Sequence, residues 1–223
     1  MQFQRLLEFI IYGGSFNPVH IGHVAFIRAL VERCASSQIL VVPTHTSPFK
    51  QGTEQLPPAL RLQMLEQALR GIPRMAVLDT ELRMSPPSFT VHTINRLRSK
   101  YPAARLVWAM GSDVYDKFSN WYCPQAILAC TDLLLVQRAG HAGDRALCSR
   151  RLLEGLPPAW RQRLRLEDDR AVDPVSGRIV VQQLHLTLPE VSSSLILERR
   201  ILQHVPEGAR ELLLEFWKRG AGV

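Results

Sequence analysis

Residues 12–23 read Y-G-G-S-F-N-P-V-H-I-G-H, and this segment determines how the rest of the chain is interpreted. The apolar residues 9–11 precede it and the apolar residues 24–27 follow it. This order predicts a buried strand, a glycine-rich turn and then a helix. Because Gly13 and Gly14 have no side chain, the backbone can bend sharply there and a ligand can come close.

The helix should begin between residues 18 and 21 and direct its free N–H groups at this turn. The positive end of its dipole lies there too, and both features favour an anion. His20 and His23 are three residues apart, so they share one face of the first helical turn. Imidazoles beside an anion site suggest transfer chemistry on a nucleotide. The alternative is a plain turn with surface histidines, but such a turn does not require two of them on one helical face.

Residues 13–23 resemble the signature of the nucleotidyltransferases that carry an H-x-G-H motif. Within them, the whole chain except residues 141–178 resembles the bacterial nicotinate-nucleotide adenylyltransferases, which usually have Asp at the position of Asn17. The resemblance implies adenylyl transfer from ATP to nicotinate mononucleotide, a step of NAD biosynthesis, with Mg²⁺ bridging the phosphates. It implies that His20 and His23 are catalytic residues that contact phosphate. The backbone N–H groups of Gly14, Ser15 and Phe16 would also donate to phosphate oxygens.

The segment at residues 38–42 reads as a second buried strand, so the chain begins with a strand–helix–strand unit and a parallel sheet. Ligands of such sheets bind beyond the carboxyl ends of the strands. We therefore expect an α/β fold, Rossmann-like, with a mostly parallel sheet and helices on both faces. Further strands are predicted at 75–78, 105–110, 131–137 and 178–184, and a final amphipathic helix at 208–218 should pack Leu212, Leu213 and Phe216.

With 223 residues, the chain is expected to form a single domain over residues 1–223, with a variable insertion at about 141–178 that contains helices at 145–156 and 159–166. No apolar run is long enough to span a bilayer, and no signal-peptide pattern is present. We expect a cytoplasmic protein without a membrane partner. The four cysteines show no C-x-x-C spacing, which favours reduced thiols.

The net charge of +7 attracts anions, but the basic residues are spread among acidic ones. This pattern favours a solvated surface over a nucleic-acid footprint, so no nucleic-acid partner is expected. The sequence shows no dedicated carboxylate cage, so no metal ligand is assigned, and it does not indicate an oligomeric state.

Residues 44–58 form a polar, proline-rich loop that contains Lys50. By itself Lys50 reads as an exposed loop lysine, whereas the resemblance implies that it reaches phosphate oxygens. The family has a histidine where this chain has Phe49. A helix follows at about 57–69, and Arg61 stands in its first turn, a poor place for a cation. Arg61 could serve a site or be a plain surface residue.

Ser88 is expected to cap a helix at about 89–100. The resemblance implies that Phe89 and Thr90, just after it, hold the pyridine carboxylate of the mononucleotide. It further implies that Gly111 lies against the nucleotide, that Asp113 binds ribose hydroxyls and that Trp121 stacks on the pyridine ring. Without the resemblance, Asp113 could be only a helix cap and Trp121 only a core residue.

Three serines at a predicted helix start, Ser192, Ser193 and Ser194, offer hydroxyls and N–H groups to an anion. The resemblance implies that they grip the triphosphate, although an ordinary serine-capped helix would also explain them. Leu197 stands where the family has arginine, and Arg200 lies nearer that helical face than Arg199 does.

Two other functions stay open at this point. One is an adenylyltransferase for another mononucleotide, such as nicotinamide mononucleotide. The other is a nucleotide-binding homologue that has lost catalysis, a reading motivated by Phe49 and Leu197. A nucleic-acid binder is a distant third.

Overall fold

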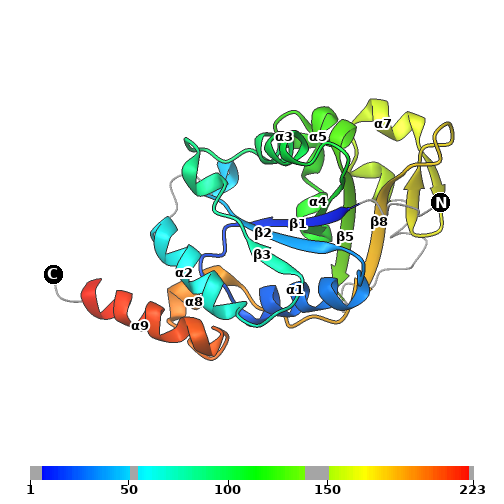
Figure 1. Cartoon of the computed structure of the whole chain (residues 1–223). Helices are drawn as coiled ribbons and strands as arrows, with labels where there is room; N and C mark the ends of the chain where they lie inside the picture. Colours follow the sequence, from blue (N-terminus) through cyan, green and yellow to red (C-terminus); the bar gives the residue numbers. More distant parts are fainter. Residues whose placement is uncertain (1–6, 51–54, 139–150, 221–223) are drawn as a thin grey trace, which may run out of the picture. The chain divides into compact units, whose positions relative to one another are not determined.

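A computed structural model of the chain describes residues 7–50, 55–138 and 151–220 (Figure 1). The chain divides into two compact units. The first comprises Met1–Tyr12 and Phe89–Thr187, and the second comprises Gly13–Ser88 and Leu188–Val223.

Eight strands are hydrogen-bonded in the order β3-β2-β1-β4-β5-β8-β7-β6. Parallel pairs join β1 to β4, β4 to β5, β5 to β8 and β2 to β3, whereas β6, β7 and β8 pair antiparallel. The strands are β1 (Glu8–Gly14), β2 (Gln38–Pro43), β3 (Met75–Val77), β4 (Arg105–Gly111), β5 (Asp132–Arg138), β6 (Arg165–Glu167), β7 (Arg170–Val172) and β8 (Ile179–Leu186). The predicted α/β, Rossmann-like fold with a mostly parallel sheet is confirmed.

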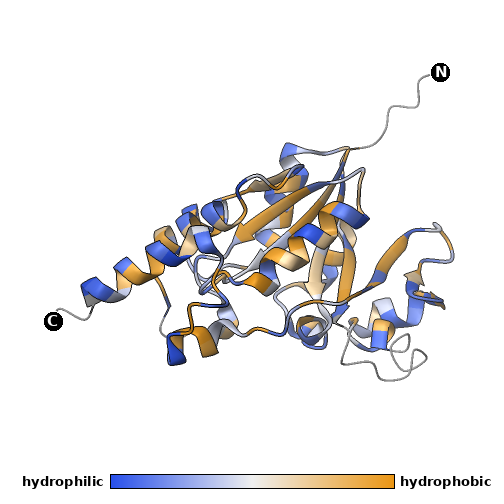
Figure 2. Ribbon diagram, turned by 90° about the horizontal axis from the view of Figure 1, so that it is seen from below, coloured by the Kyte–Doolittle hydropathy of each residue, from blue (hydrophilic) through white to orange (hydrophobic). Residues whose placement is uncertain are grey.

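The first unit is built on the apolar strands β1, β4, β5 and β8. Figure 2 shows the strands of the sheet as mainly hydrophobic ribbons. Residues 106–110 are all buried, as expected for parallel strands covered on both faces. Its helices are α3 (Thr90–Lys100), α4 (Ser112–Tyr115), η3 (Phe118–Asn120), α5 (Pro124–Cys130) and α7 (Pro158–Arg163). In α3 the residues Val91, Ile94 and Leu97 recur every three positions and are buried.

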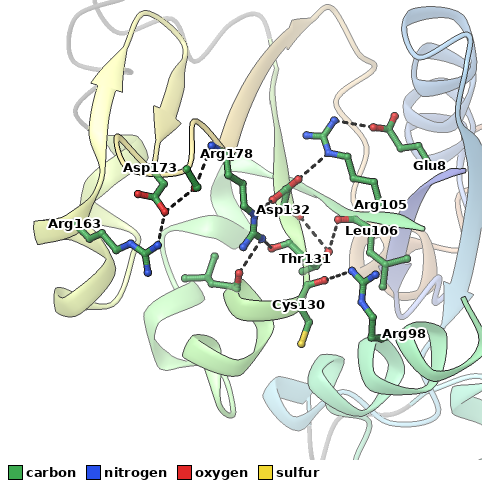
Figure 3. A network of polar contacts seen from close by, with 12 residues as sticks. Glu8, Arg98, Arg105, Leu106, Cys130, Thr131, Asp132, Arg163, Asp173 and Arg178 are labelled. Carbon is green, nitrogen blue, oxygen red and sulfur yellow. Dashed lines mark hydrogen bonds and ion pairs between the residues drawn. The ribbon is translucent and has the colours of Figure 1, made fainter. Parts of the chain in front are cut away.

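Alternating charges lie at the amino ends of four neighbouring strands of the first unit (Figure 3). Arg105 on β4 contacts Glu8 on β1 at 2.8 Å and Asp132 on β5 at 2.9 Å. Asp132 also accepts from Arg178, just before β8, at 2.7 Å. These four side chains form a charge ladder.

The second unit contains β2, β3 and the helices α1 (Ile21–Arg33), η1 (Pro48–Lys50), α2 (Pro58–Ala68), η2 (Glu81–Arg83), α8 (Ser193–Arg199) and α9 (Glu207–Gly220). A β-carbon on Gly208 would lie 3.2 Å from the carbonyl oxygen of Gln67, so α9 begins in close contact with the end of α2. In α9, Leu213 is fully buried but Phe216 is 36% exposed, so the expected packing of Phe216 is only partial.

Two local predictions differ from the structure. Ser88 does not cap α3, which begins at Thr90, because its hydroxyl instead accepts the His45 N–H at 2.9 Å. Within the described part of the 141–178 segment, α7 is followed by the unexpected β6–β7 hairpin, which pairs with β8. Of the helix predicted at 145–156, residues 151–154 are helical and residues 145–150 lie outside the described residues. Among the helices of the described ranges, none has both the length and the apolar character needed to cross a bilayer.

Candidate functional site

The predicted site residues fall into two groups, one in each unit. The second unit holds the turn between β1 and α1. Phe16 in this turn has a φ of 45°, a left-handed conformation that is rare for a residue with a side chain. Its ring is 1% exposed and lies edge-on to the His23 ring, with the centroids 5.0 Å apart. The turn therefore has one defined, tightly packed conformation.

His20 and His23 cap α1 reciprocally. The His23 N–H donates to Nδ1 of His20 at 3.3 Å, and the His20 N–H donates to Nδ1 of His23 at 3.2 Å. The two rings stack with centroids 3.6 Å apart. Because each Nδ1 accepts a hydrogen bond, the proton of each neutral imidazole is on Nε2. Both side chains are thus N–H donors through Nε2.

Gly22 between the two histidines is required by close packing. A β-carbon at this position would lie 3.1 Å from both the His20 ring and the carbonyl oxygen of Pro189. The segment before α8 therefore packs directly on the H-x-G-H motif. This explains the glycine without any contact to a ligand.

Side chains from distant parts of the second unit also hold the turn. Asn17 Oδ1 accepts the Leu56 N–H at 2.8 Å, and the Ser193 hydroxyl donates to the Pro18 carbonyl at 3.0 Å. Ser192 and Ser194 are exposed. The structure thus brings the serine motif to the turn, with one serine in a structural bond.

The sequence did not decide whether Arg61 serves a site or lies on the surface. Arg61 is 0% exposed, so the surface alternative was wrong. Among the described residues, its guanidinium donates to backbone carbonyls alone: Ser15 at 2.6 Å, Thr44 at 2.8 Å, His45 at 2.8 Å and Leu56 at 3.0 Å. Burial lowers the pKa of Arg61 to about 10, so it stays protonated at neutral pH.

The two departures from the family pattern differ in exposure. Phe49 is 60% exposed in η1, whereas Leu197 in α8 is half-buried. Lys50 ends η1, but its side chain lies outside the described residues. Arg200 follows α8, and its guanidinium lies over the Trp217 ring at 5.6 Å from the centroid.

The first unit holds Gly111 and the residues that the resemblance links to the mononucleotide. The Asp113 carboxylate folds over Gly111 so closely that a β-carbon there would lie 2.4 Å from its oxygen. Asp113 does not cap α4, because Gly111 occupies that position. Trp121 is half-buried against Phe118, with ring centroids 5.4 Å apart.

Phe89 takes the position before α3, and Thr90 is its first residue. The Phe89 ring contacts Tyr122 at 4.7 Å and His92 at 5.8 Å between centroids. Tyr122 is 54% exposed. Tyr122 and His92 were not singled out in the sequence, although Tyr122 directly follows Trp121 and His92 lies one helical turn after Phe89.

Asp113 also borders a cavity of about 140 Å³ between α4, β5, β8 and residues 151–152. Gln137 and Gln183 line it, and the buried Oε1 of Gln183 finds no hydrogen-bond partner among the described residues. Burial raises the pKa of the Tyr115 hydroxyl at its wall. Across the described ranges, His, Cys, Asp and Glu side chains form no group of three or more suited to a metal ion.

The sheet is mostly parallel, and its first strand leads into a turn at the amino end of α1 that carries two histidines. This arrangement is typical of nucleotide-binding α/β proteins such as the nucleotidyltransferases. The model of the cytidylyltransferase-like family matches residues 11–199, and the chain belongs to this family.

Curated relatives agree with this class. The chain is 36% identical over 136 residues to a probable nicotinate-nucleotide adenylyltransferase of Bacteroides fragilis, covering 61% of this chain and 68% of that one. It is 35% identical over 131 residues to the probable nicotinate-nucleotide adenylyltransferase of Aquifex aeolicus, covering 59% and 77%. The predicted resemblance is confirmed.

A solved structure shares the fold. The Plasmodium falciparum nicotinic acid mononucleotide adenylyltransferase complexed with NaAD superposes with a TM-score of 0.65 over 94% of this chain and 96% of that one. The sequence identity of 13% limits this likeness to the fold.

Proposed function

We propose that the chain transfers the adenylyl group of ATP to nicotinate mononucleotide, giving nicotinate adenine dinucleotide and pyrophosphate. The observation that supports the proposal is the reciprocal histidine cap at the turn after β1, in which both Nδ1 atoms accept hydrogen bonds and each neutral imidazole keeps its proton on Nε2. The names of the relatives at about 35% identity specify the two substrates.

The chemistry requires little beyond positioning. The phosphate of the mononucleotide is already a nucleophile at neutral pH and attacks the α-phosphorus in line. The bond to pyrophosphate breaks, so the negative charge grows on the leaving oxygens. In this proposal the Nε2–H groups of His20 and His23 and the N–H groups of Gly14, Ser15 and Phe16 stabilise that charge.

Magnesium enters this reaction as part of the substrate, MgATP. It would bridge the phosphates and offset their charge, ligated mainly by phosphate oxygens and water. Ser192, Ser194 and Lys50 are proposed to contact the outer phosphates. Because the Ser193 hydroxyl donates to Pro18, its contribution to binding would come from the N–H at the start of α8.

The mononucleotide is proposed to bind the first unit. Trp121 offers a half-buried ring for stacking, Phe89 and Thr90 lie at the start of α3, and Asp113 offers a carboxylate for ribose hydroxyls. A single domain with an insertion at about 141–178 and a cytoplasmic location remain part of the proposal.

The test is pyrophosphate release with MgATP and either nicotinate or nicotinamide mononucleotide. Release that prefers the nicotinate form supports the proposal, whereas preference for the amide form assigns a different acceptor. ATP binding without release from either would indicate the homologue that has lost catalysis. The exposed Phe49 and half-buried Leu197 motivate that alternative.

A further inference from the structure

Arg61 joins three segments of the second unit. Its donors reach the carbonyl of Ser15 in the turn, those of Thr44 and His45 after β2, and that of Leu56 before α2. A fully buried arginine is costly unless its donors are bonded, and here all four contacts are main-chain oxygens. The turn and the loop that leads to Lys50 are therefore held by one side chain.

In the part of the chain that the structure describes, the charge of Arg61 has no counterion. Within the described residues, no carboxylate forms an ion pair with it, and desolvation by burial is what lowers its pKa. A buried positive charge is screened less by water and salt than a surface charge is. It therefore adds positive potential beneath a turn assigned to phosphate.

The bond to Ser15 also fixes the direction of a backbone donor. In a trans peptide the C=O and the N–H point in opposite directions. The Ser15 carbonyl points inward to Arg61 at 2.6 Å, so the Phe16 N–H points away from Arg61. The left-handed φ of 45° at Phe16 persists only when surrounding contacts hold it.

We propose that Arg61 is a positioning residue for phosphate transfer: it orients the Phe16 N–H and supplies a buried positive charge behind the turn without touching the ligand. This inference rests on the proposed function, which assigns the turn to the phosphates of ATP.

Arg74 supplies a matched control in the same unit. Its guanidinium also donates only to carbonyls in the described structure, those of Val31, Cys34, Ala35 and Ser37. These carbonyls lie around the end of α1, away from the turn before it. Loss of Arg74 therefore removes a similar set of bonds without disturbing the Ser15–Phe16 peptide.

The experiment compares Arg61→Met, Arg61→Lys and Arg74→Met with the wild type, well below the melting temperature of each. For Arg61→Met we expect kcat to fall about a hundredfold, because the Phe16 N–H would no longer be held in position for the phosphate. The KM for the mononucleotide should stay unchanged. Arg61→Lys keeps the positive charge but lacks the planar guanidinium that bonds four carbonyls at once. ATP should therefore bind more tightly to Arg61→Lys than to Arg61→Met, while kcat stays low in both. Arg74→Met should lose thermal stability but keep kcat.

Equal losses of kcat in Arg61→Met and Arg74→Met would overturn the inference, as would wild-type kcat in both Arg61 variants. If Arg61→Met does not fold, the comparison of Arg61→Lys with Arg74→Met decides alone. If the wild type binds ATP without turnover, the proposed function fails. The inference then depends on the dissociation constant for ATP, which should rise for Arg61→Met but not for Arg74→Met. A wild type that does not bind ATP would overturn both.

Discussion

Replacing His23 by alanine and by glutamate separates its two roles, as a helix cap and as a phosphate donor. Alanine removes the acceptor of the His20 N–H and the stacked ring. Loss of one cap costs about 1 kcal/mol, and a domain of this size loses about 2–4 °C of melting temperature per kcal/mol. Loss of one donor to a developing oxyanion lowers kcat by about 10²–10³.

Glutamate at position 23 should restore the cap, because a carboxylate at the third helical position accepts the N-cap N–H and suits the helix dipole. It should lower kcat below the alanine variant, since like charges about 4 Å apart repel by about 4 kcal/mol at an effective dielectric constant of 20. The expected order of stability is therefore wild type, glutamate, alanine. The expected order of kcat is wild type, alanine, glutamate.

The assay is initial-rate pyrophosphate release under saturating MgATP, paired with thermal unfolding followed by circular dichroism. If the glutamate variant regains kcat together with stability, His23 acts only as a cap and the phosphate assignment is wrong.

Three further outcomes follow from side chains outside the turn. Asp132→Asn should lower the free energy of unfolding in urea by about 1–3 kcal/mol, because two arginines then face a neutral amide, and a change below about 0.5 kcal/mol would contradict this. The hydrogen bonds from Arg163 and Ser176 lower the pKa of Asp173 to about 2, so its ionised form stabilises the fold above about pH 4. The stability gap between the wild type and Asp173→Asn should therefore close as the pH falls from 5 towards 2, and a constant gap would refute the ion pair. Arg200→Ala should keep the KM for ATP within about twofold, because that guanidinium lies over Trp217, and a tenfold rise would show a phosphate contact.

The strand, turn and helix around the H-x-G-H motif were predictable because their signals are local. An apolar run, two glycines and a polar helix start are all read within a few residues. The reciprocal histidine cap was not predicted, because the third helical position usually holds Glu or Gln in such a box. The tautomer that it imposes depends on the hydrogen bonds of the folded turn.

Arg61 could not be assigned from local rules because its partners are distant. Ser15 is 46 residues away and Thr44 is 17 residues away. Dipole arguments show only that a cation there is unfavourable, and tertiary carbonyls reverse that balance. Ser88 fails for a related reason, since its hydroxyl bonds the His45 N–H, 43 residues away.

The β6–β7 hairpin was missed because its strands have only three residues each, too few to show a period-two pattern. One signal was present. Asp168 adopts a φ of 48° at the turn, and consecutive aspartates tolerate that conformation better than most residues. The pairing of β7 with β8 is a tertiary contact, and a short local stretch of sequence does not reveal it.

The charge ladder at the amino ends of β1, β4, β5 and β8 makes one strand order preferable to its competitors. The four strands are similarly apolar, so hydrophobic burial alone would accept them in several permutations. In the observed order, Glu8, Arg105, Asp132 and Arg178 alternate in sign. Exchanging β4 and β5 would set Glu8 beside Asp132 and Arg105 beside Arg178, and opposed like charges are destabilising. During assembly of the sheet, the ladder thus favours the observed neighbours over wrong ones through the charges at the amino ends of the strands.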